Sequence, residues 1–188
     1  MARNDYTNED SIIMRPIGPD ESEMLVRLVR EVESLVEIPD TWKPYDDERL
    51  VQLLDNEVAL NLGLYDGDDL VGAAFLVRPE HTILADTPEL SLCGLPSKGS
   101  AEITHIMLNS DWRGYGYANT LVDELVKLAD ATRGMRRVYA LVHPNDMQSR
   151  KLFERSLFVT CCSAHVPDGR ELFLYQRWFE DKTDRSRK

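Results

Sequence analysis

A predicted strand, a glycine-containing turn and a predicted helix follow one another in the middle of the chain. Residues 101–108 read as a strand, residues 112–118 form the turn Trp-Arg-Gly-Tyr-Gly-Tyr-Ala, and residues 121–129 are apolar at helical spacing. This succession aims unpaired backbone N–H groups and the positive end of the helix dipole at one spot. Such a spot binds phosphate groups. The sequence therefore predicts an anion site here, and the alternative is an ordinary turn with two glycines.

The turn does not fit the common nucleotide-binding motifs. A dinucleotide-binding turn needs a third glycine, where this chain has Asn119, and an acidic residue about 20 positions later, where Arg133 lies nearby. A G-x-x-x-x-G-K-[ST] loop does not occur in the sequence. The remaining pattern is Arg-x-x-Gly-x-Ala over 113–118, in which the glycines allow close backbone approach and the arginine adds charge-assisted hydrogen bonds.

The rest of the chain alternates between strand and helix patterns. Strands are predicted over 11–17, 58–65, 70–77, 137–142, 158–166 and 171–179, and helices over 24–36, 46–56 and from 145. The order β-α-α-β-β-β-α-β-α-β-β predicts an α/β fold with a mixed sheet covered on both faces. Residues 78–100 are expected to form a long loop near an entrance to the site.

Charge is distributed unevenly along the 188 residues. The net charge is −11, made of −13 over residues 1–100 and +2 over residues 101–188. Such acidity argues against a nucleic-acid partner. The less acidic half carries the predicted phosphate site, and the acidic half can attract a cationic amine or simply aid solubility.

The sequence has no apolar run of about 18 residues, so no membrane association is expected. Residues 1–10 are polar, without the apolar stretch of a secretory signal, and we expect a cytoplasmic protein. The three cysteines, two of them adjacent, show neither a zinc spacing nor a disulfide framework. Reduced thiols and no metal are therefore expected.

The Arg-x-x-Gly-x-Ala turn resembles the pyrophosphate loop of the GNAT acyl-coenzyme A-dependent N-acetyltransferases, and the order of elements agrees with the GNAT fold. The run from Asn145 through Ser149 to Leu152-Phe153 resembles a second segment of that family. The resemblance implies a single acyltransferase domain over 11–180 with splayed central strands. A flexible N-terminus over 1–10 and a charged tail over 181–188 would flank it.

The resemblance also implies roles for residues in binding acetyl-coenzyme A as co-substrate. The backbone of the turn would hold the pyrophosphate, the end of the preceding strand would pair with the pantetheine arm and polarise the thioester carbonyl, and the second segment would lie beside that arm. These cofactor-binding residues are Arg113, Gly114, Tyr115, Gly116, Tyr117 and Ala118, then Ile106, Met107 and Leu108, then Asn145 and Ser149.

Two residues are candidate general bases. Ala101-Glu102-Ile103 is similar to the run that carries the base in the histone-acetylating branch of the family, although a strand-start glutamate can also simply face water. His105 is the second candidate because the pKa of histidine suits neutral pH, but a lone strand histidine is more often packed. Phe153 stands where family members often have a tyrosine that protonates the leaving thiolate, so another group or water would supply that proton.

The predicted function is acetyl transfer to a primary amine, of a small molecule or a protein, by direct attack. The alternatives are a non-catalytic acyl-coenzyme A-binding or sensing module, favoured by Phe153, and a covalent route through Cys161 or Cys162. A homodimer through the last hairpin is a further expectation. Trp42 and Tyr45 are candidates to line the acceptor pocket, although such aromatics more often cover a helix end. Glu37, Asp40, Asp46 and Asp47 are candidates to attract a cationic acceptor.

Overall fold

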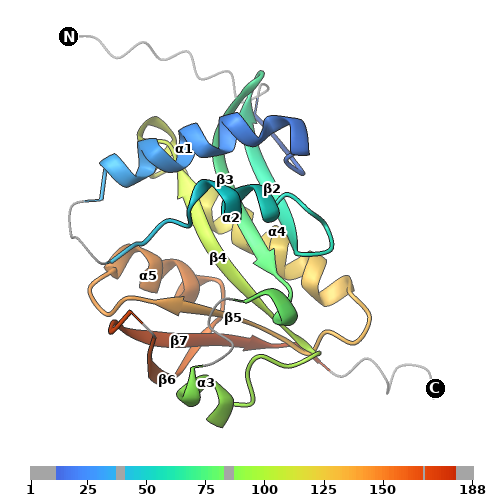
Figure 1. The fold of residues 1–188 in the computed structure, drawn as a ribbon, viewed down its shortest axis with the longest axis vertical. Coiled ribbons are helices and arrows are strands. Elements are labelled where there is room, and N and C mark those ends of the chain that lie inside the picture. The colour runs from blue at the N-terminus through green and yellow to red at the C-terminus, as the bar shows by residue number, and fades with distance from the viewer. Residues whose placement is uncertain (1–11, 37–40, 83–86, 167, 181–188) are drawn as a thin grey trace.

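A seven-stranded mixed sheet forms the centre of the computed structural model, which describes residues 12–36, 41–82, 87–166 and 168–180 (Figure 1). Its spatial order is β1-β2-β3-β4-β5-β7-β6, and only β4 and β5 run parallel to each other. The strands are β1 (Ile12–Arg15), β2 (Ala59–Asp66), β3 (Asp69–Val77), β4 (Ser100–Leu108), β5 (Arg137–Val142), β6 (Val159–His165) and β7 (Glu171–Trp178).

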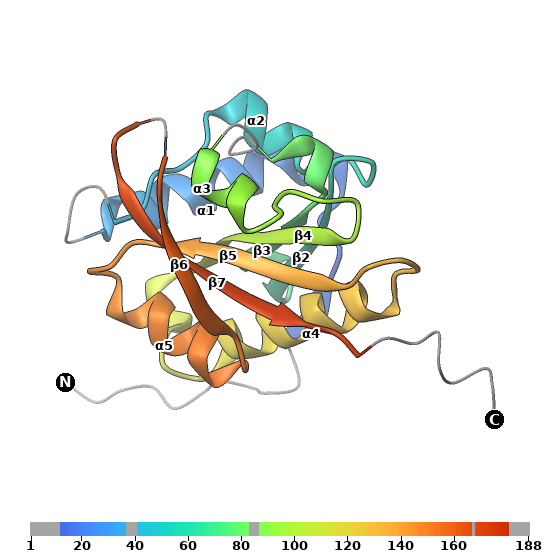
Figure 2. The same cartoon turned by 90° about the horizontal axis from the view of Figure 1, so that it is seen from below.

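Helices cover both faces of the sheet (Figure 2). One face carries α1 (Ser22–Ser34), α2 (Asp47–Gln52) and α3 (Pro88–Leu92), and the other carries α4 (Tyr117–Ala131) and α5 (Met147–Arg155). The two longest helices, α1 and α4, each bury an apolar stripe. In α4 the stripe is Leu121, Val122, Leu125, Val126 and Ala129. The described helices include none that is both long and apolar enough to cross a bilayer.

The predicted fold class is confirmed, and so is the predicted order of elements apart from the additional helix α3. Both predicted hairpins form, with the β2–β3 turn at Gly67-Asp68. The prediction that 78–100 is a loop throughout is wrong. This segment contains a 3-10 turn (Pro79–His81) and the short helix α3. Pro88 stands at the start of α3, where its fixed φ and missing N–H suit the first helical position. The predicted flexible N-terminus and charged tail lie outside the described residues.

A β-bulge in β4 decides which side chains face which helices. Ala73 pairs with Met107 and Phe75 with Thr104, so two residues of β4, His105 and Ile106, stand opposite one residue of β3. His105 has a positive φ of 49° there. The bulge reverses the alternation, because Ala101 and Ile103 face α4 before it and Ile106 and Leu108 face α4 after it. It also bends β4, and bulges are common beside active sites.

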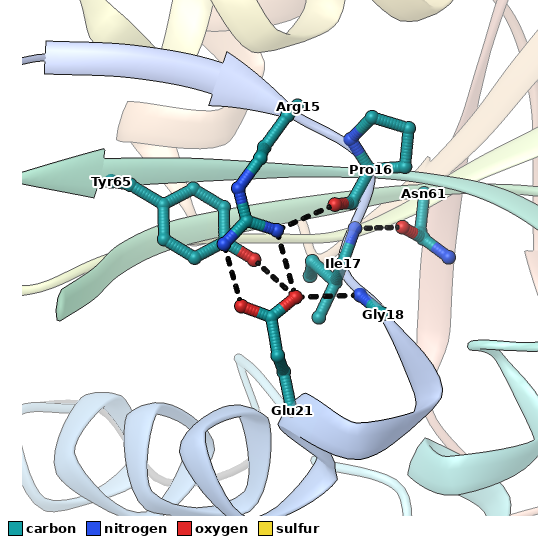
Figure 3. Close-up of polar contacts among 7 residues, drawn as sticks. All are labelled: Arg15, Pro16, Ile17, Gly18, Glu21, Asn61 and Tyr65. Atoms are coloured by element: carbon teal, nitrogen blue, oxygen red, sulfur yellow. Dashed lines mark hydrogen bonds and ion pairs between the residues drawn. The ribbon is translucent and has the colours of Figure 1, made fainter. Parts of the chain in front are cut away.

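A polar network joins β1 to the start of α1 (Figure 3). The Glu21 carboxylate accepts two hydrogen bonds from Arg15, at 2.8 and 2.7 Å, one from the Gly18 amide at 2.7 Å and one from the Tyr65 hydroxyl at 3.1 Å. The hydrogen bond with Arg15 is the main reason that the pKa of Glu21 lies at about 2. In the same turn the Ile17 amide donates to Asn61 at 2.7 Å.

Glu21→Gln is expected to lower the free energy of unfolding at pH 7 by about 1–3 kcal/mol, because the charge-assisted pair with Arg15 is lost. A carboxyl whose pKa falls on folding stabilises the protein above its unfolded pKa of 4.5, and this contribution disappears as the pH falls toward 2. Urea unfolding at pH 7 and at pH 3 measures both effects. Glu23→Gln, at an exposed position of α1, is the matched control. An equal effect of the two substitutions at pH 7 would contradict the assignment.

Candidate active site

The parallel strands β4 and β5 part from each other near their beginnings. Their pairing covers only Ser100–Glu102 with Arg137–Tyr139, although β4 continues to Leu108 and β5 to Val142. Beyond Glu102 and Tyr139 the two described strands form no further pairs, and their carboxyl ends diverge (Figure 1). The predicted splay of the central strands is therefore confirmed. In open α/β sheets, ligands bind beyond the carboxyl ends of the strands, and this is where the opening lies.

The helix that follows β4 begins beside this opening with a free N-terminus. Gly114 and Gly116 have φ values of 88° and 89°, a left-handed conformation that glycine adopts without strain. Gly116 is the N-cap of α4 and no side chain caps the helix. A Cβ built on either glycine meets no described heavy atom within 4 Å. The start of α4 thus has no side-chain cap among the described residues and has open space beside both glycines, as an anion site requires.

The backbone at the end of β4 also faces the opening. The Asn109 amide donates to the Val71 carbonyl of β3 at 2.9 Å. Because the backbone groups of successive strand residues point to opposite edges, the N–H and C=O of Leu108 point away from β3, toward the opening. There the Arg113 Nε donates to the Leu108 carbonyl at 3.1 Å. This contact holds the arginine side chain against the end of β4.

The Glu102 carboxylate lies at the point where the strands part. Glu102 belongs to the last β4–β5 pair and is 3% exposed, so the alternative of a glutamate in water is excluded. The Thr82 hydroxyl donates to its Oε2. Burial raises the pKa of Glu102 above its ordinary value, opposed by the hydrogen bond from Thr82 and by the charge of Arg49. A buried carboxyl with a raised pKa is a candidate for proton transfer.

His105 lies in the bulge of β4 with both ring nitrogens occupied. Its Nε2 accepts a hydrogen bond from the Tyr45 amide at 3.3 Å, so Nδ1 carries the proton and donates to the Thr104 hydroxyl at 2.9 Å. Burial, and then the charge of Arg49, lowers the pKa of His105 to about 4. The ring also packs against Trp42 and Tyr45, at centroid distances of 5.8 and 4.1 Å. This geometry favours a neutral histidine that anchors residues 42–45 to β4.

The sequence from residue 26 to residue 157 matches the model of the acetyltransferase (GNAT) family. This match covers more than half of the chain and includes the β4–α4 turn, the Glu102 position and the start of α5. The chain belongs to the GNAT acetyltransferase family. No curated protein matches its sequence.

Solved structures share the GNAT fold of this chain at low sequence identity. Arabidopsis thaliana NAA60 in complex with a bisubstrate analogue superposes with a TM-score of 0.69 and 19% identity, over 89% of this chain and 97% of that chain. PaiA N-acetyltransferase from Thermoplasma acidophilum in complex with coenzyme A gives 0.67 and 16%, over 90% and 99%. A GNAT-family acetyltransferase from Streptococcus pneumoniae gives 0.69 and 13%, over 90% and 99%.

The start of α5 lies at the same end of the GNAT sheet, because α5 follows β5 as α4 follows β4. The N-cap is Asp146, whose carboxylate accepts from the Ser149 amide at 2.9 Å and from its hydroxyl at 2.7 Å. Asp146, and not Asn145 at the start of the predicted helix, therefore caps α5. The Asn145 amide instead donates to the His143 Nδ1 at 3.1 Å. That Asn145 and Ser149 contact the pantetheine arm stays a prediction.

Phe153 lies in the core of the GNAT domain. It is 3% exposed, and its ring packs against Phe158 at 5.1 Å and Tyr175 at 6.1 Å between centroids. No proton can come from this side chain. The position is therefore structural in this chain.

Two of the four acidic residues predicted to attract an acceptor have structural partners. Asp46 caps α2 by accepting from the Arg49 amide at 2.8 Å, and Asp47 forms an ion pair with Arg30 at 2.8 Å. Glu37 and Asp40 lie outside the described residues. The carboxylates of Asp46 and Asp47 are thus engaged in structural contacts, and their attraction of a cationic acceptor stays a prediction.

A buried polar cluster around Glu102 was not predicted from the sequence. Thr82 precedes β4 by many residues, Tyr139 lies on β5 and Arg49 on α2, and no motif connects them. Burial and the nearby Glu102 raise the pKa of Tyr139 and of Tyr45, so both phenols stay protonated. The only available signal was an isolated tyrosine in the apolar run 137–142.

Proposed function

We propose that this GNAT chain transfers the acetyl group of acetyl-coenzyme A directly to a primary amine. The observation that carries the proposal is the opening between β4 and β5, which has the uncapped start of α4 on one side and the Glu102 carboxylate at its apex. NAA60, with acetyl-coenzyme A, and PaiA, with coenzyme A, have been solved on the same fold and support this choice of co-substrate.

The proposed cofactor site follows the opening from α4 to β4. The amides from Gly114 to Ala118 would bind the pyrophosphate with help from the Arg113 guanidinium. The backbone from Ile106 to Leu108 would pair with the pantetheine arm, and an N–H on this edge would stabilise the negative charge that develops on the thioester oxygen. Asn145 and Ser149 would border the arm from the start of α5.

Glu102 is the proposed general base and acts through a water molecule, because its carboxylate is 3% exposed. It takes a proton from the ammonium group of the acceptor, and the neutral amine then attacks the thioester carbonyl. The nitrogen of the tetrahedral intermediate gives up its extra proton to water, and the intermediate collapses to an amide and the coenzyme A thiolate. The thiolate takes up a proton from water, so that the products are the amide and coenzyme A. His105 was the second candidate base, but both of its ring nitrogens already hold hydrogen bonds. It is therefore proposed as a residue that positions residues 42–45 against β4.

The acceptor is proposed to be either a small-molecule amine or a protein amino group. The fold occurs in both kinds of enzyme: in an aminoglycoside acetyltransferase with coenzyme A and in a ribosomal-protein-S5-alanine acetyltransferase from Vibrio fischeri. In this chain the acceptor would enter between two segments. One is α2 together with the residues that precede it, and the other is the segment that carries α3, because both segments lie on the face of the sheet that holds Glu102.

Release of free coenzyme A across a panel of amines tests the proposal. The panel contains polyamines, aminoglycosides and peptides with free N-termini, and at least one class should accelerate thiol release well above hydrolysis. Mass spectrometry should find one added acetyl group on that amine. If acetyl-coenzyme A binds and no amine accelerates release, the chain is an acyl-coenzyme A-binding module, as the phenylalanine at position 153 would allow.

A further inference from the structure

The three cysteines of the chain converge at one point, although Cys93 is far in sequence from the adjacent pair Cys161 and Cys162. Cys93 follows α3, and Cys161 and Cys162 lie on β6. The three Sγ atoms all lie within 4.8 Å of one another, and those of Cys93 and Cys162 are 3.0 Å apart. This cluster lies where α3 packs against β6, on the face of the sheet that also carries α1 and α2 (Figure 2).

A β-bulge brings the two adjacent cysteines to the same side. Thr160 pairs with Tyr175 and Cys162 with the next residue of β7, Leu174, so Cys161 is an extra residue in β6. In a regular strand neighbouring side chains point to opposite faces. The bulge removes that alternation and allows both thiols to reach Cys93.

The spacing of the three sulfurs suits one small soft cation. Sulfur ligands lie about 2.3 Å from Zn²⁺, so two of them in a tetrahedral site are separated by about 3.8 Å. The sulfur separations here span 3.0 Å to at most 4.8 Å, which brackets that value. Thiolates prefer Zn²⁺ and Cu⁺ to hard cations such as Mg²⁺.

Charge at the cluster also favours a metal over a disulfide. Arg137 is 7% exposed, stacks on Trp178 at 4.6 Å and donates to the carbonyls of Cys93 and Gly94. Within the described part of the chain no carboxylate forms a salt bridge with it. A buried guanidinium needs a negative partner. Three thiolates on Zn²⁺ carry a net charge of −1, whereas a Cys93–Cys162 disulfide carries none.

We propose that Cys93, Cys161 and Cys162 bind one zinc ion and that a water molecule takes the fourth position. On binding, three thiols each release a proton and form three sulfur–zinc bonds, with no change of oxidation state. The site is structural: it fixes α3 to β6 and so holds the segment that borders the acceptor side of the opening. The prediction of no metal would then be wrong, whereas the prediction of reduced thiols would still hold.

Zinc titration of the reduced, metal-free full chain tests this proposal without any use of activity. Competition with a chromophoric chelator should show one zinc ion per chain, and Co²⁺ should give the intense ultraviolet band of thiolate ligation. Cys161→Ser should weaken binding at least tenfold and reduce that band. His165→Gln is the control, because His165 lies at the end of the same strand and pairs with Glu89 outside the cluster. Cys161 is exposed, so its substitution should leave the fold intact, which circular dichroism verifies.

Four results would overturn the proposal. The first is no stoichiometric binding by the reduced wild-type chain. The second is binding by Cys161→Ser or Cys93→Ser that equals the wild type. The third is a Co²⁺ complex without the thiolate band, which would place the ion elsewhere. The fourth is a Cys93–Cys162 disulfide that dioxygen forms in the zinc-supplied chain once the reductant is removed, because bound zinc should protect these thiolates from oxidation.

Discussion

Gly116→Trp is expected to weaken acetyl-coenzyme A binding by about 100-fold or more. Gly116 is the N-cap of α4, and its Cβ direction leads into open space in front of the helix. An indole there would occupy the volume that the pyrophosphate needs. Each hydrogen bond from an amide to a charged phosphate contributes about 1.5–3 kcal/mol, so the loss of two corresponds to about 100-fold or more in Kd. Isothermal titration calorimetry measures the change.

Gly134→Trp is the matched control for this substitution. Gly134 has a φ of 84°, close to the 89° of Gly116, and its Cβ direction is equally free of neighbours. The two variants therefore carry similar backbone strain, and only one of them blocks the start of α4. Equal binding by both variants would refute the assignment of the phosphate site to the β4–α4 turn.

Glu102→Gln is expected to lower kcat by about 100-fold or more, with a smaller effect on the affinity for acetyl-coenzyme A, because a general base contributes on this scale. Burial raises the pKa of Glu102, so its base form accumulates as the pH rises through that raised pKa. The wild-type rate should therefore increase over this pH range, and the rate of the variant should not. Rates of thiol release from pH 5 to pH 9, with the best amine, measure both effects.

Stability separates a catalytic role of Glu102 from a structural one. Folding raises the pKa of Glu102, so the ionised carboxylate destabilises the folded state. The free energy of unfolding therefore falls as the pH rises through that pKa. Glu102→Gln should then be at least as stable as the wild type at pH 8. Glu48→Gln, on the exposed surface of α2, controls for the lost charge. An unchanged pH profile in Glu102→Gln would exclude this residue as the base.

The sequence predicted most of the fold because its signals were local. Strand alternation over 58–65, the apolar stripe of α4 and the glycine turns each report the conformation of their own residues. The glycine turn between β4 and α4 was predicted for the same reason, since a short motif between a strand and a helix defines its own geometry. The short helix α3 was missed because five residues give too little periodicity to recognise.

Features that depend on register could not be predicted from periodicity. The bulges at His105 and Cys161 each add one residue to a strand, and the sequence near them shows no glycine or proline that would mark a bulge. The burial of Glu102 depends on Thr82 and Tyr139, which approach it only in the folded chain. The convergence of the cysteines depends on packing of α3 against β6, which no spacing in the sequence records.

Backbone amide NMR during titration with acetyl-coenzyme A tests the central claim most directly, namely that the split between β4 and β5 receives the co-substrate. The largest shift changes should come from residues 106–108 and 113–118, on the edge of β4 and at the start of α4. Saturable shifts concentrated elsewhere, or none at millimolar acetyl-coenzyme A, would contradict it.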